Sequence, residues 1–189
     1  MLNLILFGPP GAGKGTQSDK IKEHFDLVHL STGDIFRYNI KNNTELGQTA
    51  KGYMDKGELV PDAVTIKMLE SEVDKHRDGN GFIFDGFPRT VAQAEALDKF
   101  LATKQTEISK MVALEVEDEE LKQRLLERGK TSGRPDDQDK NIIKNRIAEY
   151  NRKTAPLKTY YKNQNKFTAV DGMGTIDEIT ERLITAIDQ

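Results

Sequence analysis

A glycine-rich segment directly after an apolar run constrains this chain more than any other feature. Residues 2–7 read Leu-Asn-Leu-Ile-Leu-Phe, and residues 8–16 read Gly-Pro-Pro-Gly-Ala-Gly-Lys-Gly-Thr. A helical pattern follows, with Ile21 and Phe25 on one side. Glycines let backbone N–H groups converge on an anion, the helix start adds positive potential, and Lys14 supplies a full charge. The segment predicts a strand, a phosphate-binding loop and a helix.

Two other interpretations fit this segment less well. A glycine-rich turn with a chance lysine would not need a strand before it and a helix after it. A dinucleotide-binding fingerprint has a different final spacing from Gly11-x-Gly13-x-Gly15 and would leave Lys14 without a role. General phosphate loops carry serine or threonine directly after the lysine, whereas here Gly15 stands there and Thr16 follows. The departure argues against a small GTPase or a generic ATPase.

Short apolar runs alternate with longer helical patterns along the chain. The runs are nearly unbroken, as in parallel strands covered on both faces, and lie at residues 2–7, 27–30, 82–84, 111–116 and 167–170. Two helical stripes are formed by Val91, Ala94, Leu97 and Leu101, and by Ile176, Ile179, Leu183 and Ile187, the second preceded by a capping box at Thr175 and Glu178. The alternation predicts an α/β sheet wound on both sides.

Two polar segments stand apart from this alternation. Residues 31–60 have a helical pattern interrupted by Gly47, Gly52 and Gly57. Residues 129–137 read Gly-Lys-Thr-Ser-Gly-Arg-Pro-Asp-Asp, which predicts a hinge-like loop between two helices. We expect both segments to be surface flaps. Further on, Pro156 predicts a kink or break between two helices.

Composition excludes several classes of function. With 189 residues, 36% of them hydrophobic, the chain suits one compact domain. A net charge of −3 gives no reason to expect a nucleic-acid or membrane partner. The chain has no cysteine, so disulfides and thiolate metal sites are excluded. The run at residues 2–7 is too short for a signal-peptide core or a membrane span, and we expect a cytoplasmic monomer.

A second candidate site follows the apolar run at residues 82–84. Asp85 ends this run, where a phosphate-loop fold would hold magnesium or its waters, although an aspartate can also simply cap a turn. The chain continues as Gly86-Phe87-Pro88-Arg89, and Gln93 lies four residues beyond Arg89. If both are helical, they share a face and offer a charge for a phosphate and an amide for a base edge.

Arginines recur further along the chain. Arg124 and Arg128 lie on one face of a helical pattern over residues 121–129, and Arg134 and Arg146 follow. Such a set suits phosphoryl transfer, because the moving group needs cations in place and water excluded. The simpler interpretation of the first pair is an exposed helix face with acidic neighbours at positions 120 and 127, since surface ion pairs contribute little and need no function.

These motifs together resemble the adenylate kinase family of nucleoside-monophosphate kinases, in its short-lid form. The loop matches G-x-P-G-x-G-K-G-T, residues 31–37 match S-T-G-D-x-x-R, and residues 85–93 match D-G-[FY]-P-R-x-x-x-Q. The resemblance covers nearly the whole chain. It implies a P-loop NTPase-type α/β fold in which a five-stranded parallel sheet carries helices on both faces. The core would be residues 1–30, 61–126 and 138–189, with an NMP-binding flap at 31–60 and a short lid at 127–137.

The resemblance also implies the reaction and its residues. ATP would give a phosphoryl group to AMP, with Mg²⁺ on the ATP side, its waters held by Asp85, and no zinc. ATP would be bound by Gly11, Ala12, Gly13, Lys14, Gly15, Thr16, Arg124, Arg128 and Gly174. AMP would be bound by Thr32, Arg37, Glu58, Leu59, Val60, Gly86, Phe87, Pro88, Arg89, Gln93, Arg134 and Arg146. The catalytic set would be Lys14, Arg89, Arg128, Arg134 and Arg146.

One spacing departs from the family pattern. The interval from Asp137 to Arg146 is one residue longer than expected, which leaves Lys144 as an alternative to Arg146. Asp136 and Asp137 match the acidic pair at the far hinge of the lid. We expect the flap and the lid to close over the substrates together.

Other functions remain as alternatives. A UMP/CMP kinase shares the loop and the short lid, but Thr32 and Gln93 favour an adenine acceptor. A catalytically silent nucleotide-sensing module would be expected to lack Lys14, Arg89 or a lid arginine, and an ATP-driven switch or motor would need more chain. The three histidines show no metal spacing, and we expect them at the surface or at helix ends: His24, His29 and His76.

Overall fold

A parallel sheet forms the centre of the protein. The structure is a computed structural model that describes residues 1–76 and 78–189. Five strands of the described residues pair in the order β2-β3-β1-β4-β5, all parallel. They are β1 (Leu2–Phe7), β2 (Val28–Ser31), β3 (Gly81–Asp85), β4 (Lys110–Glu115) and β5 (Phe167–Asp171). The predicted five-stranded parallel sheet is confirmed, with strand ends within two residues of the apolar runs.

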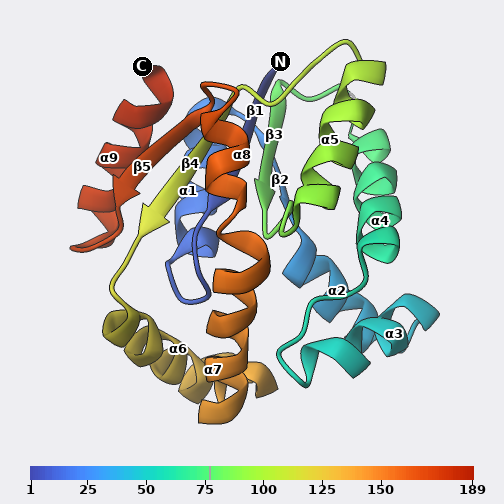
Figure 1. Cartoon of the computed structure of the whole chain (residues 1–189), viewed down its shortest axis with the longest axis vertical. Coiled ribbons are helices and arrows are strands. Elements are labelled where there is room, and N and C mark those ends of the chain that lie inside the picture. Colours follow the sequence, from blue (N-terminus) through green and yellow to red (C-terminus); the bar gives the residue numbers. More distant parts are fainter. Residues whose placement is uncertain (77) are drawn as a thin grey trace.

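Helices cover both faces of the sheet (Figure 1). One face packs against α4 (Asp62–Lys75), α5 (Val91–Thr103) and α8 (Leu157–Lys162). The other packs against α1 (Lys14–Phe25), α6 (Asp118–Ser132) and α9 (Ile176–Asp188). Helix α9 starts with the predicted capping box of Thr175 and Glu178. Crossover helices on both faces follow from parallel pairing, because each strand must return to the same end of the sheet.

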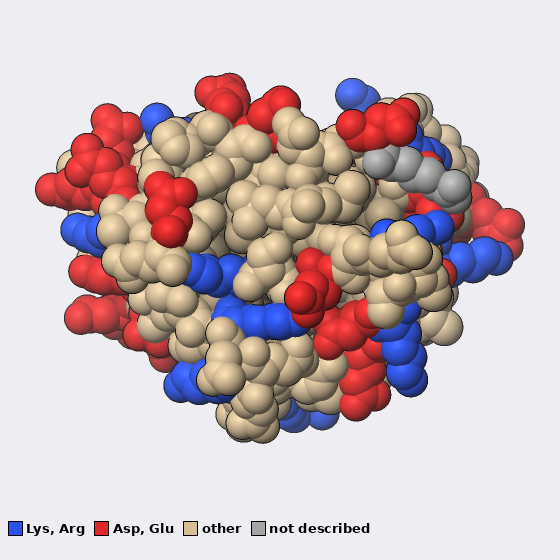
Figure 2. Space-filling model, turned by 90° about the horizontal axis from the view of Figure 1, so that it is seen from above, with Lys and Arg blue, Asp and Glu red and all other residues tan. Residues whose placement is uncertain are grey.

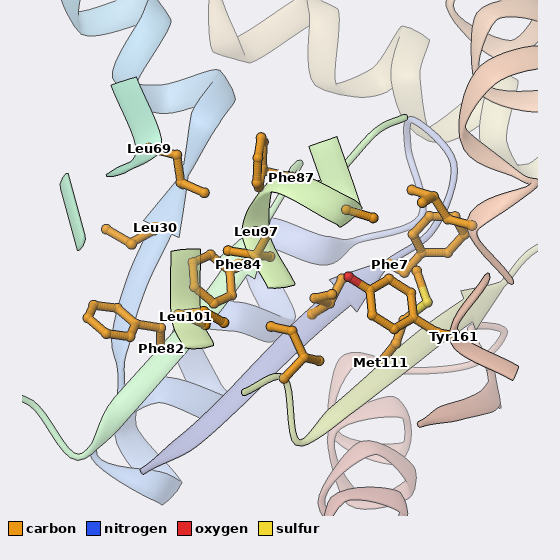
Figure 3. Packing of buried hydrophobic residues seen from close by; sticks show 14 of the residues in the cluster. Phe7, Leu30, Leu69, Phe82, Phe84, Phe87, Leu97, Leu101, Met111 and Tyr161 are labelled. Carbon is orange, nitrogen blue, oxygen red and sulfur yellow. The ribbon is translucent and has the colours of Figure 1, made fainter. Parts of the chain in front are cut away.

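Alternating side chains of the central strands build two cores. In β1, Leu4 and Leu6 join the cluster under α1 and α9, whereas Ile5 and Phe7 join the cluster under α4, α5 and α8. Figure 3 shows the cluster under α4, α5 and α8, where Tyr161 from α8 lies near Met111 from β4. Because both faces are buried, nearly every strand position must be apolar, which explains the unbroken runs in the sequence.

The polar segments lie beyond the carboxyl ends of the strands, at the opposite end of the molecule from both chain termini (Figure 1). The flap contains α2 (Thr32–Lys41) and α3 (Glu45–Met54). On the other side lie the end of α6, a 3-10 helix (Pro135–Asp137) and α7 (Lys140–Glu149). A π-helical turn (Tyr150–Thr154) connects α7 to α8, which begins after Pro156. The predicted break at this proline is confirmed.

The prediction of a loop from residue 129 is wrong at its start. Helix α6 continues through Ser132 and ends at Gly133, whose φ of 64° is left-handed. Gly129 is inside the helix, and a Cβ there would lie 2.4 Å from the carbonyl oxygen of Asp137. The first glycine therefore permits close packing of the next segment, and only the second one ends the helix.

The surface carries both signs of charge. On the face seen from above in Figure 2, acidic and basic side chains are interspersed around uncharged residues. No helix within residues 1–76 and 78–189 combines the length and the apolar character needed to cross a bilayer.

Candidate active site

A cavity of about 710 Å³ lies at the carboxyl ends of the strands. Crevices of this kind are where open α/β sheets bind ligands. Every residue proposed from the sequence for ATP, AMP or magnesium lines it. These residues come from the start of α1 and the loop before it, the flap, the end of β3 and the segment after it, α6, the turn that follows α6, α7 and the loop after β5. The structure thus gathers residues that are up to about 160 positions apart in the chain around one space, from Gly11 to Gly174.

The loop after β1 leaves a helix start open to the cavity. Gly13 precedes α1 with a φ of 93°, which other residues adopt at a cost, and no side chain caps the helix. The N–H groups of the first turn are therefore free of a side-chain partner, and the helix dipole adds positive potential there. This geometry suits a phosphate group.

Lys14 lies across this loop. Its Nζ donates to the carbonyl oxygens of Gly8 at 2.9 Å and Pro9 at 3.1 Å. Burial lowers the pKa of Lys14 from 10.5 to about 8; Asp85 opposes the shift, and the charges of nearby arginines add to it. A cation held in this way gains from an anion that enters the cavity.

Asp85 ends β3 next to Ser31 of β2. Its carboxylate lies 3.2 Å from Nε2 of His29, whose side chain is 14% exposed. The expectation that all three histidines lie at the surface or at helix ends is therefore wrong for His29, which sits within β2 and lines the cavity. It is correct for His24 and His76, both exposed and near helix ends.

The flap contributes a hydroxyl and a charged pair. Thr32 is buried, and its Oγ1 donates to the carbonyl oxygen of Gly86 at 2.9 Å. Arg37 donates to Asp34 at 2.5 Å, one turn earlier in α2. The same carboxylate lies 3.5 Å from Arg134, so one aspartate contacts arginines from both the flap and the lid.

The segment after β3 positions Arg89 and Gln93. Arg89 precedes α5, so the two residues do not share a helical face as the spacing suggested. Instead the Gln93 side-chain oxygen accepts from the Arg89 backbone N–H at 2.7 Å, and Arg89 Nε donates to the carbonyl oxygen of Gly86 at 2.7 Å. Thr154 donates to the Arg89 carbonyl oxygen at 2.7 Å. Both side chains are thereby fixed at the cavity wall.

Arginines from α6 and α7 share one buried carboxylate. Arg128 binds both oxygens of Asp137, at 2.6 and 2.9 Å, and Arg146 binds one at 2.5 Å. Arg146 also lies 3.1 Å from Asp136. Lys144 is exposed and does not line the cavity, so the structure favours Arg146 over this alternative.

Arg124 bonds to its own helix and to the loop after β5. It donates to Glu120 at 2.7 Å and to the carbonyl oxygen of Gly172 at 3.1 Å. The predicted acidic neighbour is thus present at position 120, but Glu127 pairs with Lys130 instead. Because Arg124 also lines the cavity, an ion pair on the helix and a binding role are compatible.

The cationic side chains around the cavity repel one another, which lowers the pKa of several of them. Burial and, after it, the charge of Arg146 lower the pKa of Arg89 to about 10, although Asp85 opposes the shift. Burial also lowers the pKa of Arg134, with added repulsion from Arg37 and Arg128. Negative charge in the cavity would stabilise the charged form of each of these groups. Clustered perturbed groups of this kind are typical of a functional site.

Comparisons with known proteins agree with this arrangement. The family model described as adenylate kinase matches residues 6–166. A protein named adenylate kinase from Flavobacterium psychrophilum is 68% identical, with all of this chain and 99% of that protein covered. Proteins with the same name from Flavobacterium johnsoniae and Bacteroides thetaiotaomicron are 63% and 51% identical, over 100% of this chain and 99% and 100% of theirs.

The chain belongs to the adenylate kinase family.

Not every proposed site residue of this adenylate kinase family member offers its side chain to the cavity. The side chains of Ala12, Val60 and Phe87 belong to hydrophobic clusters, so at the cavity wall these positions contribute mainly backbone. Phe87 is among the fully buried residues of the cluster in Figure 3. Their apolar side chains anchor the loops that carry the polar groups.

The residues present fit the magnesium that adenylate kinases use with ATP. No group of three or more acidic, histidine or cysteine side chains gathers as a metal cage among the described residues. Magnesium, however, keeps several waters and is usually held by one or two carboxylates plus substrate phosphates. Asp85, 7% exposed and lining the cavity beside the phosphate loop, suits that arrangement.

Sequence reasoning missed several groups at the site. Asp34 lies inside the S-T-G-D motif, and its position three residues before Arg37 was a signal for the pair. His29 and Asp85 are 56 residues apart, and only the pairing of β2 with β3 brings them together. Asp62 contacts Gln93 across 31 residues, with no local pattern to indicate it.

Proposed function

We propose that this chain catalyses reversible phosphoryl transfer from ATP to AMP, giving two ADP. One observation carries the proposal: the phosphate loop with Lys14 and the acceptor set of Thr32, Arg37, Arg89 and Gln93 line a single cavity. Two phosphate chains can then meet end to end, which in-line transfer requires. Membership of the adenylate kinase family supports the same reaction.

The proposal assigns roles by chemistry. The loop and Lys14 bind the phosphates of ATP, while Arg124 and Gly174 lie beside its base. Thr32 and Gln93 read the acceptor base, and Arg37 and Arg89 bind its phosphate. Arg128, Arg134 and Arg146 neutralise the charge of the transferring group. Asp85 holds waters of the magnesium ion, which contributes charge neutralisation on the ATP phosphates.

The proposal also includes the division of the chain and its setting. Residues 31–60 act as the AMP-binding flap and residues 127–137 as a short lid, with the remainder as core. The enzyme works as a monomer in the cytoplasm, without nucleic acid or membrane. Light scattering of the purified protein at enzyme-assay concentrations tests the monomer.

A coupled assay tests the reaction. AMP, UMP, CMP and GMP are offered separately with ATP and Mg²⁺, and formation of the nucleoside diphosphates is followed. We expect the highest kcat/KM with AMP. Preference for UMP or CMP would replace the substrate assignment with that of a pyrimidine kinase, and absence of transfer to every acceptor would favour a nucleotide-sensing module.

A further inference from the structure

The amide of Gln93 is bonded at both of its ends. Its oxygen accepts from the Arg89 backbone N–H at 2.7 Å, and its nitrogen donates to Oδ1 of Asp62 at 2.9 Å. Gln93 is 1% exposed and lines the cavity, whereas Asp62 lies behind it at the start of α4. The two bonds join the segment after β3 to the helix that follows the flap.

The two partners have opposite hydrogen-bonding character. A backbone N–H can only donate, and a carboxylate can only accept. The atom beside Arg89 must therefore be the Gln93 oxygen, and the atom beside Asp62 must be its nitrogen. A rotated amide would place two donors together at Arg89 and two acceptors together at Asp62, both unfavourable in a buried site.

Asp62 is itself fixed in this position. The hydroxyl of Thr90 donates to the same Oδ1 atom at 3.0 Å and accepts from the Gln93 backbone N–H at 3.2 Å. Thr90 thus caps α5 and holds the carboxylate at the same time. If the Asp62 carboxylate turned away from Gln93, the Thr90 hydroxyl would lose its acceptor.

The fixed amide keeps one acceptor and one donor for a ligand. An amide oxygen has two lone pairs and an amide nitrogen has two hydrogens. In Gln93 one lone pair and one hydrogen already make hydrogen bonds within the protein. Adenine offers a 6-amino donor beside a ring-nitrogen acceptor, which matches this order. A 6-oxo purine offers an acceptor at position 6 and, on its Watson–Crick edge, a donor at N1, which is the reverse order.

We propose that Asp62 is a positioning residue that selects 6-amino over 6-oxo purine monophosphates by holding the Gln93 amide in one orientation. The inference rests on the proposed function, in which Gln93 reads the acceptor base. Without Asp62 only the Arg89 backbone N–H opposes rotation of the amide, so the rotated form that suits a 6-oxo base becomes less costly. A site built to hydrogen-bond one pattern rejects the reversed one because buried groups would be left unpaired.

The test compares AMP with inosine monophosphate, in which oxygen replaces the 6-amino group. Asp62→Ala is expected to raise KM for AMP about tenfold, the scale of one hydrogen bond, with a smaller change in kcat and none in KM for ATP. The ratio of kcat/KM for AMP over inosine monophosphate should fall about tenfold. Asp62→Asn keeps an acceptor oxygen and should retain most of the ratio.

A double variant separates positioning from general damage. In a Gln93→Ala background, adding Asp62→Ala should change the ratio no further, because the amide that Asp62 orients is gone. If thermal melting shows that Asp62→Ala does not fold, Asp62→Ser replaces it: serine suits a helix start and is too short to reach Gln93.

Two failures are distinguishable. A wild-type enzyme that does not use AMP overturns the proposed function. A wild-type enzyme that prefers AMP, beside an Asp62→Ala variant with the same preference, overturns only the role of Asp62. A fall of equal size in the Gln93→Ala background also overturns it.

Discussion

Lys14 shows how a single residue can prepare a site for its ligand. Its amino group donates to two loop carbonyl oxygens. Burial and the charges of nearby arginines lower its pKa to about 8, although Asp85 opposes the shift. An entering polyanion would favour the charged form and raise this pKa again. Binding of ATP and protonation of Lys14 are therefore linked.

The linkage predicts proton uptake when ATP binds above pH 8. At pH 8.5 much of Lys14 is neutral in the free protein, because the pH exceeds its pKa of about 8. Bound phosphates restore the charge, so a proton is taken up and ATP affinity falls as the pH rises further, by up to about tenfold per pH unit. Calorimetric titrations at pH 8.5 in two buffers of different ionisation enthalpy measure this uptake.

Two variants of Lys14 test the source of the proton and the need for the charge. In Lys14→Arg the charge persists at pH 8.5, so the uptake should disappear. In Lys14→Met most turnover should be lost while the chain stays folded. Uptake of the same size in Lys14→Arg would assign the proton to another group.

Residues differ in how far the sequence alone could predict them. Gly13 and Lys14 belong to a contiguous motif. Because a helix start binds anions through a few consecutive residues, the local sequence alone predicts their role. Asp62 and His29 act on partners 31 and 56 residues away. No local period encodes such pairs, because they depend on which strands and helices become neighbours in the fold.

At the scale of elements, strand prediction succeeded where burial is uniform. The central strands are covered on both faces, so continuous apolar runs mark them. The lid was harder to predict. Gly129 has the composition of a loop start, but it lies inside α6 because the backbone of Asp137 packs directly against it. A contact eight residues further along the chain decides the role of this glycine.

The buried carboxylate of Asp137 is expected to stabilise the folded protein at the lid hinge. Its carboxylate is fully buried and binds Arg128 and Arg146. Burial raises its pKa, but the hydrogen bonds and charges of these arginines outweigh this and leave the pKa below its ordinary value. Asp137→Asn should cost about 2 kcal/mol, less than a fully buried pair because Arg128 is partly exposed. Thermal unfolding at pH 7 should shift down by about 4–8 °C.

The pH dependence of this effect has a definite sign. The native pKa lies below the unfolded value, so the stabilisation is complete above about pH 4 and is lost as the pH falls through the native pKa. The difference between wild type and Asp137→Asn should therefore shrink below about pH 4. Asp139→Asn is the matched control, because asparagine caps α7 as well as aspartate does. Equal losses in the two variants would contradict a special role for Asp137.

At the scale of the whole molecule, the flap contacts the lid side of the cavity. Asn145 of α7 donates to the carbonyl oxygen of Lys56 at 3.4 Å, and Asp34 of the flap lies 3.5 Å from Arg134. Gly57 is buried between these parts. A Cβ at Gly57 would lie 3.0 Å from both the Ile142 carbonyl oxygen and Cγ of Arg146. We expect this arrangement to be the one that keeps water from the phosphates.

Gly57→Ala should therefore impair closure. The residue has a φ of 72°, which costs alanine about 1–2 kcal/mol, and the added methyl group would push the flap away from α7. We expect kcat/KM to fall about tenfold for both ATP and AMP, since about 1.4 kcal/mol corresponds to a factor of ten. Steady-state kinetics with each nucleotide varied in turn measure this.

Gly52→Ala separates closure from the mere loss of a glycine in the flap. Gly52 lies inside α3, where a Cβ would meet nothing within 4 Å. Alanine is the better helix former by about 1 kcal/mol, so this variant should melt at the same or a higher temperature and keep wild-type kinetics. If Gly57→Ala also keeps wild-type kinetics, then flap and α7 need not approach this closely for turnover. If instead both variants lose activity equally, the flap needs flexibility within α3, and the contact at Gly57 is not what limits closure.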